Sequence, residues 1–230
     1  MEIIKTDKPE LLAIKLVEEK IKLFKNQPIL LLLSGGSWLS IYEKINPEDF
    51  TEHVTIGMLD ERFSNDKTIN NFVQFKQTHI YEEFVQKGVK FIDTQVHEAE
   101  TLESLTKRFE KSLRDWRVQN PTGIILATMG MGPDGHTAGI FSTLDISNIP
   151  KDDWVTGYEV DESVNQFTKR VTVTPHFLIR EIQEAICYVA GESKCEVLKS
   201  IISKNESSKN YPALIWQEMK GVVVVTDCKI

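Results

Sequence analysis

The chain has 230 residues, of which 41% are hydrophobic and 27% charged, an ordinary composition for a globular protein with a sizeable core. Its formal net charge of −7 argues against a general affinity for nucleic acid or anionic membranes. No apolar run approaches the ~20 residues of a membrane-spanning helix, and residues 1–5 lack the pattern of a signal peptide. We therefore expect a cytoplasmic protein that binds neither nucleic acid nor membrane.

Strands and helices are expected to alternate along the first half. Pro9 suits the start of a helix, which Pro28 ends, and the continuous aliphatic run at 29–33 is typical of a central parallel strand. The elements expected next are a glycine turn at 34–37, a helix from 38, a strand at 54–59, a polar loop at 60–70, a helix at 71–84, a short strand near 89–92, a helix over 102–116 and a strand at 124–127.

The second half is less regular, but strands separated by helices are expected there too. Strands are expected at 154–160, 171–174, 185–190 and 222–226, helices from Pro175, Ser193 and Pro212, and surface loops at 142–153 and 203–211. No internal repeat or linker divides the chain. The sequence predicts one α/β domain over 1–230, Rossmann-like and doubly wound, with a mostly parallel sheet and helices on both faces.

The three cysteines are Cys187, Cys195 and Cys228. Their odd count and their spacing match neither a disulfide framework nor a metal site. We expect buried free thiols in a reducing compartment.

A glycine-rich stretch after the strand at 124–127 carries Asp134 and His136. Glycine allows a tight turn and a close approach of ligand to backbone, and ligands of open α/β sheets bind at the carboxyl ends of the strands. An imidazole, with an ordinary pKa of ~6.5, can accept a proton from water near neutral pH. Asp134 could orient the ring. A His-x-Asp metal pair is the alternative, but no third ligand cluster accompanies it, so no metal is expected.

Two earlier segments follow buried strands in the same way. Ser34-Gly35-Gly36-Ser37 could cup a phosphate or could be a turn needed only for chain closure. Asp60-Glu61-Arg62 could form part of a site or could be a solvated charge cluster. Later in the chain, Arg170 could flank a sheet edge, whereas Lys194 lies near a helix start, where a cation is unfavourable unless an anion is bound.

These segments together resemble one family. Met129 to Phe141 is similar to the signature loop GMGxDGHTAxxF of 6-phosphogluconolactonases. The other blocks of that family follow in the family's order across residues 28–228: Ser34-Gly35-Gly36-Ser37, Asp60-Glu61-Arg62, Arg170-Val171-Thr172-Val173-Thr174 and Gly191-Glu192-Ser193-Lys194. The chain departs from the family at Trp38 and Leu39, which replace Thr-Pro, at Gly139, which replaces Ser, and in a shortened loop after Arg62.

The resemblance implies hydrolysis of 6-phospho-D-glucono-1,5-lactone to 6-phosphogluconate, with no cofactor and no metal. It implies catalytic roles for His136, Asp134, Arg62 and Asp60, and phosphate binding by Ser34, Gly35, Gly36, Ser37, Arg170 and Lys194. The expected partner is a phosphorylated sugar lactone, and the protein is expected to be a monomer or homodimer.

Two alternatives stay open. A glucosamine-6-phosphate isomerase or deaminase shares the fold, but its loop normally carries a glutamate where this chain has Phe141. A sugar-phosphate-binding protein without catalysis is the other, motivated by the altered loop after Arg62 and by Gly139.

Overall fold

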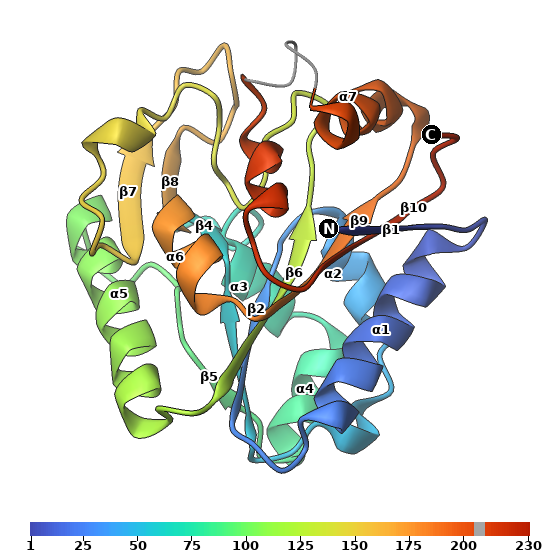
Figure 1. The fold of residues 1–230 in the computed structure, drawn as a ribbon. Coiled ribbons are helices and arrows are strands. Elements are labelled where there is room, and N and C mark those ends of the chain that lie inside the picture. Colours follow the sequence, from blue (N-terminus) through green and yellow to red (C-terminus); the bar gives the residue numbers. More distant parts are fainter. Residues whose placement is uncertain (205–209) are drawn as a thin grey trace.

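The main feature of the computed structural model, which describes residues 1–204 and 210–230, is a seven-stranded sheet, which can be followed in Figure 1. Its strand order is β1-β10-β9-β6-β2-β3-β5, and all neighbouring strands are parallel. The strands are β1 (Glu2–Lys5), β2 (Ile29–Leu33), β3 (Val54–Met58), β5 (Lys90–Phe91), β6 (Ile124–Gly130), β9 (Glu184–Val189) and β10 (Val222–Thr226). Of the loop expected at 203–211, residues 205–209 lie outside the described residues.

Helices cover both faces of this sheet, as expected for the α/β class. Ile29, Leu31 and Leu33 face a core shared with the first four helices, and Leu30 and Leu32 face a second core beneath the later ones. The helices are α1 (Pro9–Leu23), α2 (Ser37–Tyr42), α3 (Asn71–Lys76), α4 (His79–Gln86), α5 (Leu102–Gln119), α6 (Pro175–Glu181) and α7 (Glu192–Ser203). No helix in the described part of the chain is both long and apolar enough to cross a membrane.

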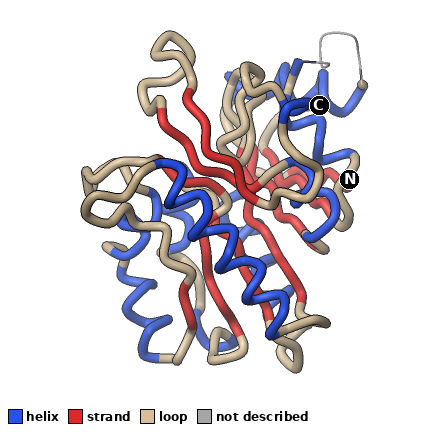
Figure 2. Tube along the Cα trace, turned by 90° about the vertical axis from the view of Figure 1, so that its left-hand side faces the viewer, coloured by secondary structure: helices blue, strands red, loops and turns tan. Residues whose placement is uncertain are grey.

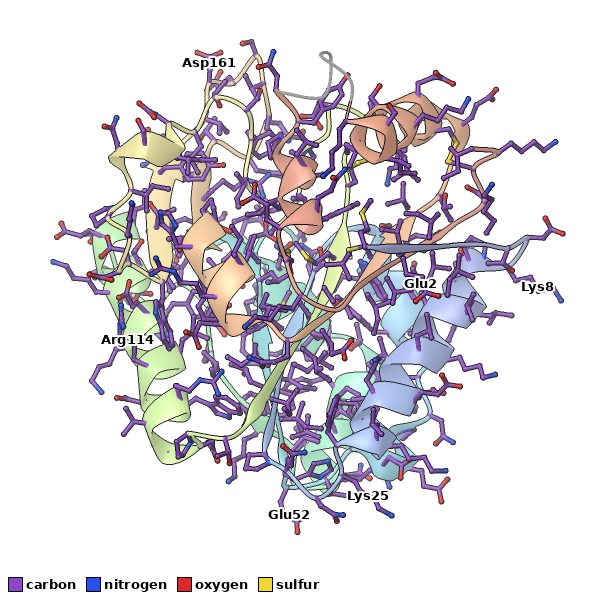
Figure 3. The ribbon with its side chains drawn as sticks, in the orientation of Figure 1. Glu2, Lys8, Lys25, Glu52, Arg114 and Asp161 are labelled. Atoms are coloured by element: carbon purple, nitrogen blue, oxygen red, sulfur yellow. A yellow bond between two sulfur atoms is a disulfide. The ribbon has the colours of Figure 1, made fainter. Side chains whose placement is uncertain are left out.

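A second, antiparallel sheet has the order β4-β8-β7 and was not expected. It consists of β4 (Asp60–Arg62), β7 (Val155–Glu159) and β8 (Lys169–Val173). A polar loop was predicted from residue 60. This prediction was wrong for Asp60–Arg62, which form strand β4 because their backbone pairs with β8. The β7–β8 hairpin extends beyond the large sheet (Figure 2), and Asp161 lies near its tip (Figure 3).

Two helix predictions also need correction. The single helix expected at 71–84 is two helices, α3 and α4, separated at Gln77 and Thr78. Thr78 adopts an extended backbone and its hydroxyl donates to the carbonyl of Phe75 at 2.6 Å, which ends the first helix without glycine or proline. The helix expected after Pro212 is a 3₁₀ helix, Pro212–Gln217. Strand β1 was not among the expected elements.

The prediction of three free thiols was wrong for two of them. Cys195, in α7, and Cys228, near the carboxyl end of the chain, form a disulfide, drawn as a yellow bond beside α7 in Figure 3. Cys187 is a buried free thiol, and burial raises its pKa well above the ordinary value. The odd cysteine count concealed the pair, because only the fold brings α7 next to the terminal segment.

Reduction of the Cys195–Cys228 bond should destabilise the protein. The bond joins residues separated by 33 positions. Closing a loop of that length lowers the conformational entropy of the unfolded chain and so stabilises the folded state by about 3–4 kcal/mol. Urea unfolding with and without dithiothreitol measures the loss. Cys187→Ser should lose as much stability in reductant as the wild type, whereas Cys195→Ser/Cys228→Ser should lose none. An equal loss in all three proteins would contradict the Cys195–Cys228 disulfide.

The strand order reverses between β6 and β2. From β2 the chain moves outward to β3 and β5, whereas from β6 it moves the other way to β9 and β10. In an open parallel sheet such a reversal separates the loops that leave the two neighbouring strands and opens a crevice at their carboxyl ends. The segments that follow Leu33 and Gly130 therefore meet at one edge.

Candidate functional site

A pocket of about 310 Å³ lies at this edge. All the predicted site residues except Asp134 line it. Its walls are formed by Ser34, Gly35, Gly36, Ser37, Asp60, Arg62, Asn71, Gly130, Met131, Gly132, Pro133, His136, Ala138, Gly139, Asn165, Phe167, Arg170 and Lys194. Residues from six separate segments thus converge, as expected if the strands end together.

The loop after β6 is a tight turn that presents His136. The amide of Gly132 donates to the carbonyl of His136 at 2.9 Å, and the amide of Gly135 donates to the carbonyl of Gly132 at 3.0 Å. Gly135 has a φ of 79°, a conformation that favours glycine. At Gly132, a Cβ would lie 2.2 Å from the imidazole ring, so only glycine allows this close approach.

Asp134 fixes the orientation of the His136 ring. One Asp134 carboxylate oxygen lies 2.5 Å from Nδ1 of His136, and the ring stacks on Phe141 with a centroid separation of 4.4 Å. Burial would raise the pKa of Asp134, but the hydrogen bond from His136 and its charge outweigh burial and lower it. Nε2 is left without a protein partner among the described residues, and it is the nitrogen available for proton transfer.

The Ser34–Ser37 loop is held by its neighbours rather than by its own hydroxyls. The amide of Ser34 donates to Tyr42 Oη at 3.0 Å and to Thr128 Oγ1 at 3.1 Å. Trp38, a departure from the family pattern, donates its indole N–H to the carbonyl of Met129 at 2.8 Å and so ties α2 to the end of β6. Within the described chain, the hydroxyls of Ser34 and Ser37 have no protein partner and are free for a ligand.

Lys194 lies on the first turn of α7. The amide of Gly191, which has a φ of 98°, donates to the carboxylate of Asp227 at 3.1 Å and fixes the start of the helix. Burial lowers the pKa of Lys194, and the charge of Asp227 opposes this shift. Lys194 forms no ion pair with any described residue, so its charge at the pocket is available to an anion.

Arg170, in contrast, is already paired. It is 4% exposed and donates to Asp60 at 3.3 Å, to the side chain of Asn165 at 3.1 Å and to the carbonyl of Phe167 at 3.1 Å. A guanidinium has five N–H donors, so two are left for a ligand. Asp60 therefore balances the charge of Arg170 within the wall of the pocket.

Gly139 approaches the same ion pair. It has a φ of 64°, and a Cβ there would lie 2.7 Å from Cβ and from Oδ2 of Asp60. The serine common in the family could not occupy this backbone position without a shift of Asp60. The departure at Gly139 thus has a packing reason and does not require a loss of catalysis.

Glu61 is the buried residue that supports this side of the pocket. Its carboxylate accepts hydrogen bonds from the amides of Arg62, Asn71 and Phe72 and from the hydroxyl of Thr94, at 2.5 to 3.0 Å. Burial raises the pKa of Glu61 to about 8, although the four donors act in the opposite direction. Glu61 therefore joins β4 to the start of α3 and does not face the pocket.

Sequence reasoning missed Asn165 and Phe167 in the β7–β8 loop and Tyr158 on β7. The hydroxyl of Tyr158 donates to the carbonyl of Gly139 at 2.5 Å and accepts from the amide of Phe141 at 3.2 Å, which supports the segment after His136. No periodicity or motif marks these residues. Only their long-range contacts identify them.

In the described ranges, the group of three or more His, Cys, Asp or Glu side chains with ligand atoms close together is Cys195, Asp227 and Cys228, where both sulfurs are in the disulfide. The pocket brings together no such group within those ranges.

The sequence is similar to those of known proteins. Residues 10–225 match the family model described as glucosamine-6-phosphate isomerases/6-phosphogluconolactonase. A 6-phosphogluconolactonase of Thermotoga maritima is 29% identical over 191 residues, covering 82% of this chain and 78% of the relative. A glucosamine-6-phosphate deaminase of Borreliella afzelii is 25% identical over 229 residues, covering 92% and 82%.

A solved structure supports the fold. The 6-phosphogluconolactonase from Trypanosoma cruzi superposes with a TM-score of 0.78 at 21% identity, covering 98% of this chain and 93% of that one. Because the family model spans nearly the whole chain, the protein belongs to the glucosamine-6-phosphate isomerase/6-phosphogluconolactonase family.

Proposed function

We propose that the protein hydrolyses 6-phospho-D-glucono-1,5-lactone to 6-phosphogluconate, a step of the oxidative pentose phosphate pathway. The observation that carries the proposal is that one pocket holds both an imidazole oriented by a carboxylate and a lysine that has no ion-pair partner among the described residues, beside a glycine-serine loop. A phosphorylated lactone needs both features, a base for water and a cation for its phosphate. The Thermotoga maritima relative named above is a 6-phosphogluconolactonase.

The phosphate end of the substrate is assigned to Lys194 and the Ser34–Ser37 loop. The ammonium group of Lys194 supplies charge, and the hydroxyls of Ser34 and Ser37 supply hydrogen bonds. Arg170 contributes its two remaining N–H groups while it stays paired with Asp60. An acidic protein thus binds an anion through a few placed cations.

The chemical step is assigned to His136. Nε2 accepts a proton from water as the water oxygen bonds to the lactone carbonyl carbon. Arg62 or the amides of the glycine loop stabilise the resulting oxyanion. The carbonyl then re-forms, the bond to the ring oxygen breaks, and His136 returns the proton to that oxygen. Asp134 holds the ring and stabilises its protonated form.

Phe141 favours the lactonase over the deaminase. The deaminases carry a glutamate at this position that assists ring opening, whereas here the phenyl ring stacks on His136 at 4.4 Å. A phenyl ring cannot exchange protons. The similarity to the Borreliella afzelii deaminase nevertheless makes glucosamine 6-phosphate the substrate to test in parallel.

The test measures hydrolysis of the phosphorylated lactone above the uncatalysed background, with glucosamine 6-phosphate and unphosphorylated gluconolactone assayed separately. We expect turnover of the phosphorylated lactone, no ammonia from glucosamine 6-phosphate and weak turnover of unphosphorylated gluconolactone. Lys194→Met should raise KM for the phosphorylated lactone and leave the unphosphorylated one nearly unaffected. Ammonia release without lactonase activity would reverse the assignment, and binding of 6-phosphogluconate without any turnover would indicate a non-catalytic binding protein.

A further inference from the structure

Two arginines lie directly opposite each other beside the pocket. Arg62 on β4 pairs in register with Arg170 on the antiparallel strand β8. Opposed residues in such a pair have Cβ atoms about 4.5–5.5 Å apart, and like charges at this distance are destabilising. The charge of Arg170 accordingly acts to lower the pKa of Arg62, in the same direction as the larger effect of burial. Some other contact must separate the two guanidinium groups.

Asp60 forms an ion pair with only one of the two arginines, although its charge also acts to raise the pKa of Arg62. It pairs with Arg170 at 3.3 Å, and Arg170 is further fixed by Asn165 and by the carbonyl of Phe167. Arg62 has no ion-pair partner within the described part of the chain. Its Nε is buried without a hydrogen-bond partner, and no hydrogen bond of its side chain to a described residue fixes the guanidinium plane.

The ring of Phe167 provides the missing contact. Cζ of Arg62 lies 4.3 Å from the centroid of this ring, a separation at which the π face attracts a cation. The ring constrains the guanidinium plane without using any of its N–H donors. Arg62 is therefore held at the pocket, and within the described chain the N–H donors of its two Nη atoms are available to a developing negative charge.

The loop that carries Phe167 is built to place this ring. The side chain of Asn165 accepts the amide of Phe167 at 2.9 Å and an N–H of Arg170 at 3.1 Å. The carbonyl of Phe167 accepts Nε of Arg170 at 3.1 Å. Arg170 thus anchors the main chain of Phe167, and the side chain of Phe167 in turn holds Arg62.

We propose that Phe167 is a positioning residue that directs Arg62 toward the oxyanion of the reaction. The inference rests on the lactonase function proposed above and adds a residue that the family motifs do not include. An aromatic face, unlike a hydrogen-bonded carboxylate, holds the guanidinium plane without using the Nη donors of Arg62, which stay available to the oxyanion.

A double-mutant cycle tests this role. Phe167→Leu removes the π face but keeps an apolar side chain and the carbonyl that anchors Arg170. We expect kcat for the lactone to fall by about 3- to 20-fold, the range that corresponds to a lost cation–π contact, with little change in KM. Phe167→Tyr, which keeps the ring, should restore most of the lost kcat. In an Arg62→Ala background, Phe167→Leu should change kcat by less than about twofold.

A purely structural role would give a different pattern. The same loss of kcat from Phe167→Leu in both backgrounds, or no rescue by tyrosine, would overturn the proposal. Val164→Ala is the matched control, because Val164 lies in the same loop with 37% of its surface exposed and does not line the pocket. Thermal unfolding of each variant identifies loss of fold.

Calorimetric binding of 6-phosphogluconate separates this inference from the proposed function. If the wild type lacks lactonase activity, the proposed function fails. Affinity for 6-phosphogluconate is then measured in the wild type, Phe167→Leu, Arg62→Ala and the double variant. A smaller effect of Phe167→Leu in the Arg62→Ala background than in the wild type still supports the role of Phe167. Additive losses overturn it. Failure of the wild type to bind 6-phosphogluconate would overturn both.

Discussion

Replacement of His136 by alanine should lower kcat for the phosphorylated lactone by about 10²- to 10⁴-fold, the usual contribution of general base catalysis. The loss arises because water then has no acceptor for its proton at the carbonyl carbon. Since Lys194 and the Ser34–Ser37 loop are unchanged, the Kd of 6-phosphogluconate should stay within a few-fold of the wild-type value. Steady-state kinetics corrected for spontaneous hydrolysis, together with calorimetry, check both expectations.

Two further variants sharpen this result. His97→Ala is the control, because His97 is exposed and does not line the pocket, and its kcat should equal that of the wild type. Asp134→Asn keeps the size of the side chain but removes the charge that stabilises the protonated ring, so kcat should fall less than for His136→Ala. An unchanged kcat in His136→Ala would remove the histidine from the mechanism.

Replacement of Glu61 by alanine should be the most destabilising change at the site, with a loss of about 3 kcal/mol or more in the free energy of unfolding. The side chain is fully buried, and its removal leaves three backbone amides and the hydroxyl of Thr94 without their acceptor. Urea unfolding measures the loss. Glu61→Gln retains one oxygen but turns an N–H₂ group toward a backbone donor, so its loss should be smaller, about 1–3 kcal/mol.

The cost of Glu61→Gln should depend on pH. The folded state raises the pKa of Glu61 to about 8, above the ordinary value of ~4.3, so the folded protein holds this proton more tightly than the unfolded chain does. The contribution of the carboxyl to stability is therefore complete below about pH 4 and is lost as the pH rises toward 8. Glutamine does not titrate, so the difference between wild type and variant should shrink from pH 5 to pH 8. A difference that grows with pH would show that the hydrogen bonds, and not burial, determine the ionisation.

The parts of the site that the sequence predicts best are those that directly follow buried parallel strands. Ser34 to Ser37 and Asp134 to His136 each come after a continuous apolar run, and parallel strands bring such segments to one edge. Local pattern and long-range geometry agree there. The role of Lys194 was implied by the family resemblance, since a cation at a helix start is unfavourable unless an anion is bound, and Lys194 lies at the pocket.

The remainder depends on contacts that no local pattern contains. Arg62 was expected near the site, but its place in a strand follows from pairing with β8. Phe167 lies in a hairpin loop without periodicity, and its relation to Arg62 exists only in three dimensions. The bond between Cys195 and Cys228 likewise depends on how α7 packs against the last residues.

Strand β1 has a practical consequence for anyone who shortens or tags the amino terminus. It covers the outer edge of β10, whose sequence Val222-Val223-Val224-Val225-Thr226 is almost wholly aliphatic, and it presents the charged residues Glu2 and Lys5 to solvent. Without residues 1–5, that valine-rich strand would offer unpaired amides and carbonyls to other molecules, an arrangement that promotes aggregation. A purification handle is therefore better separated from Met1 by a flexible spacer than substituted for the first residues.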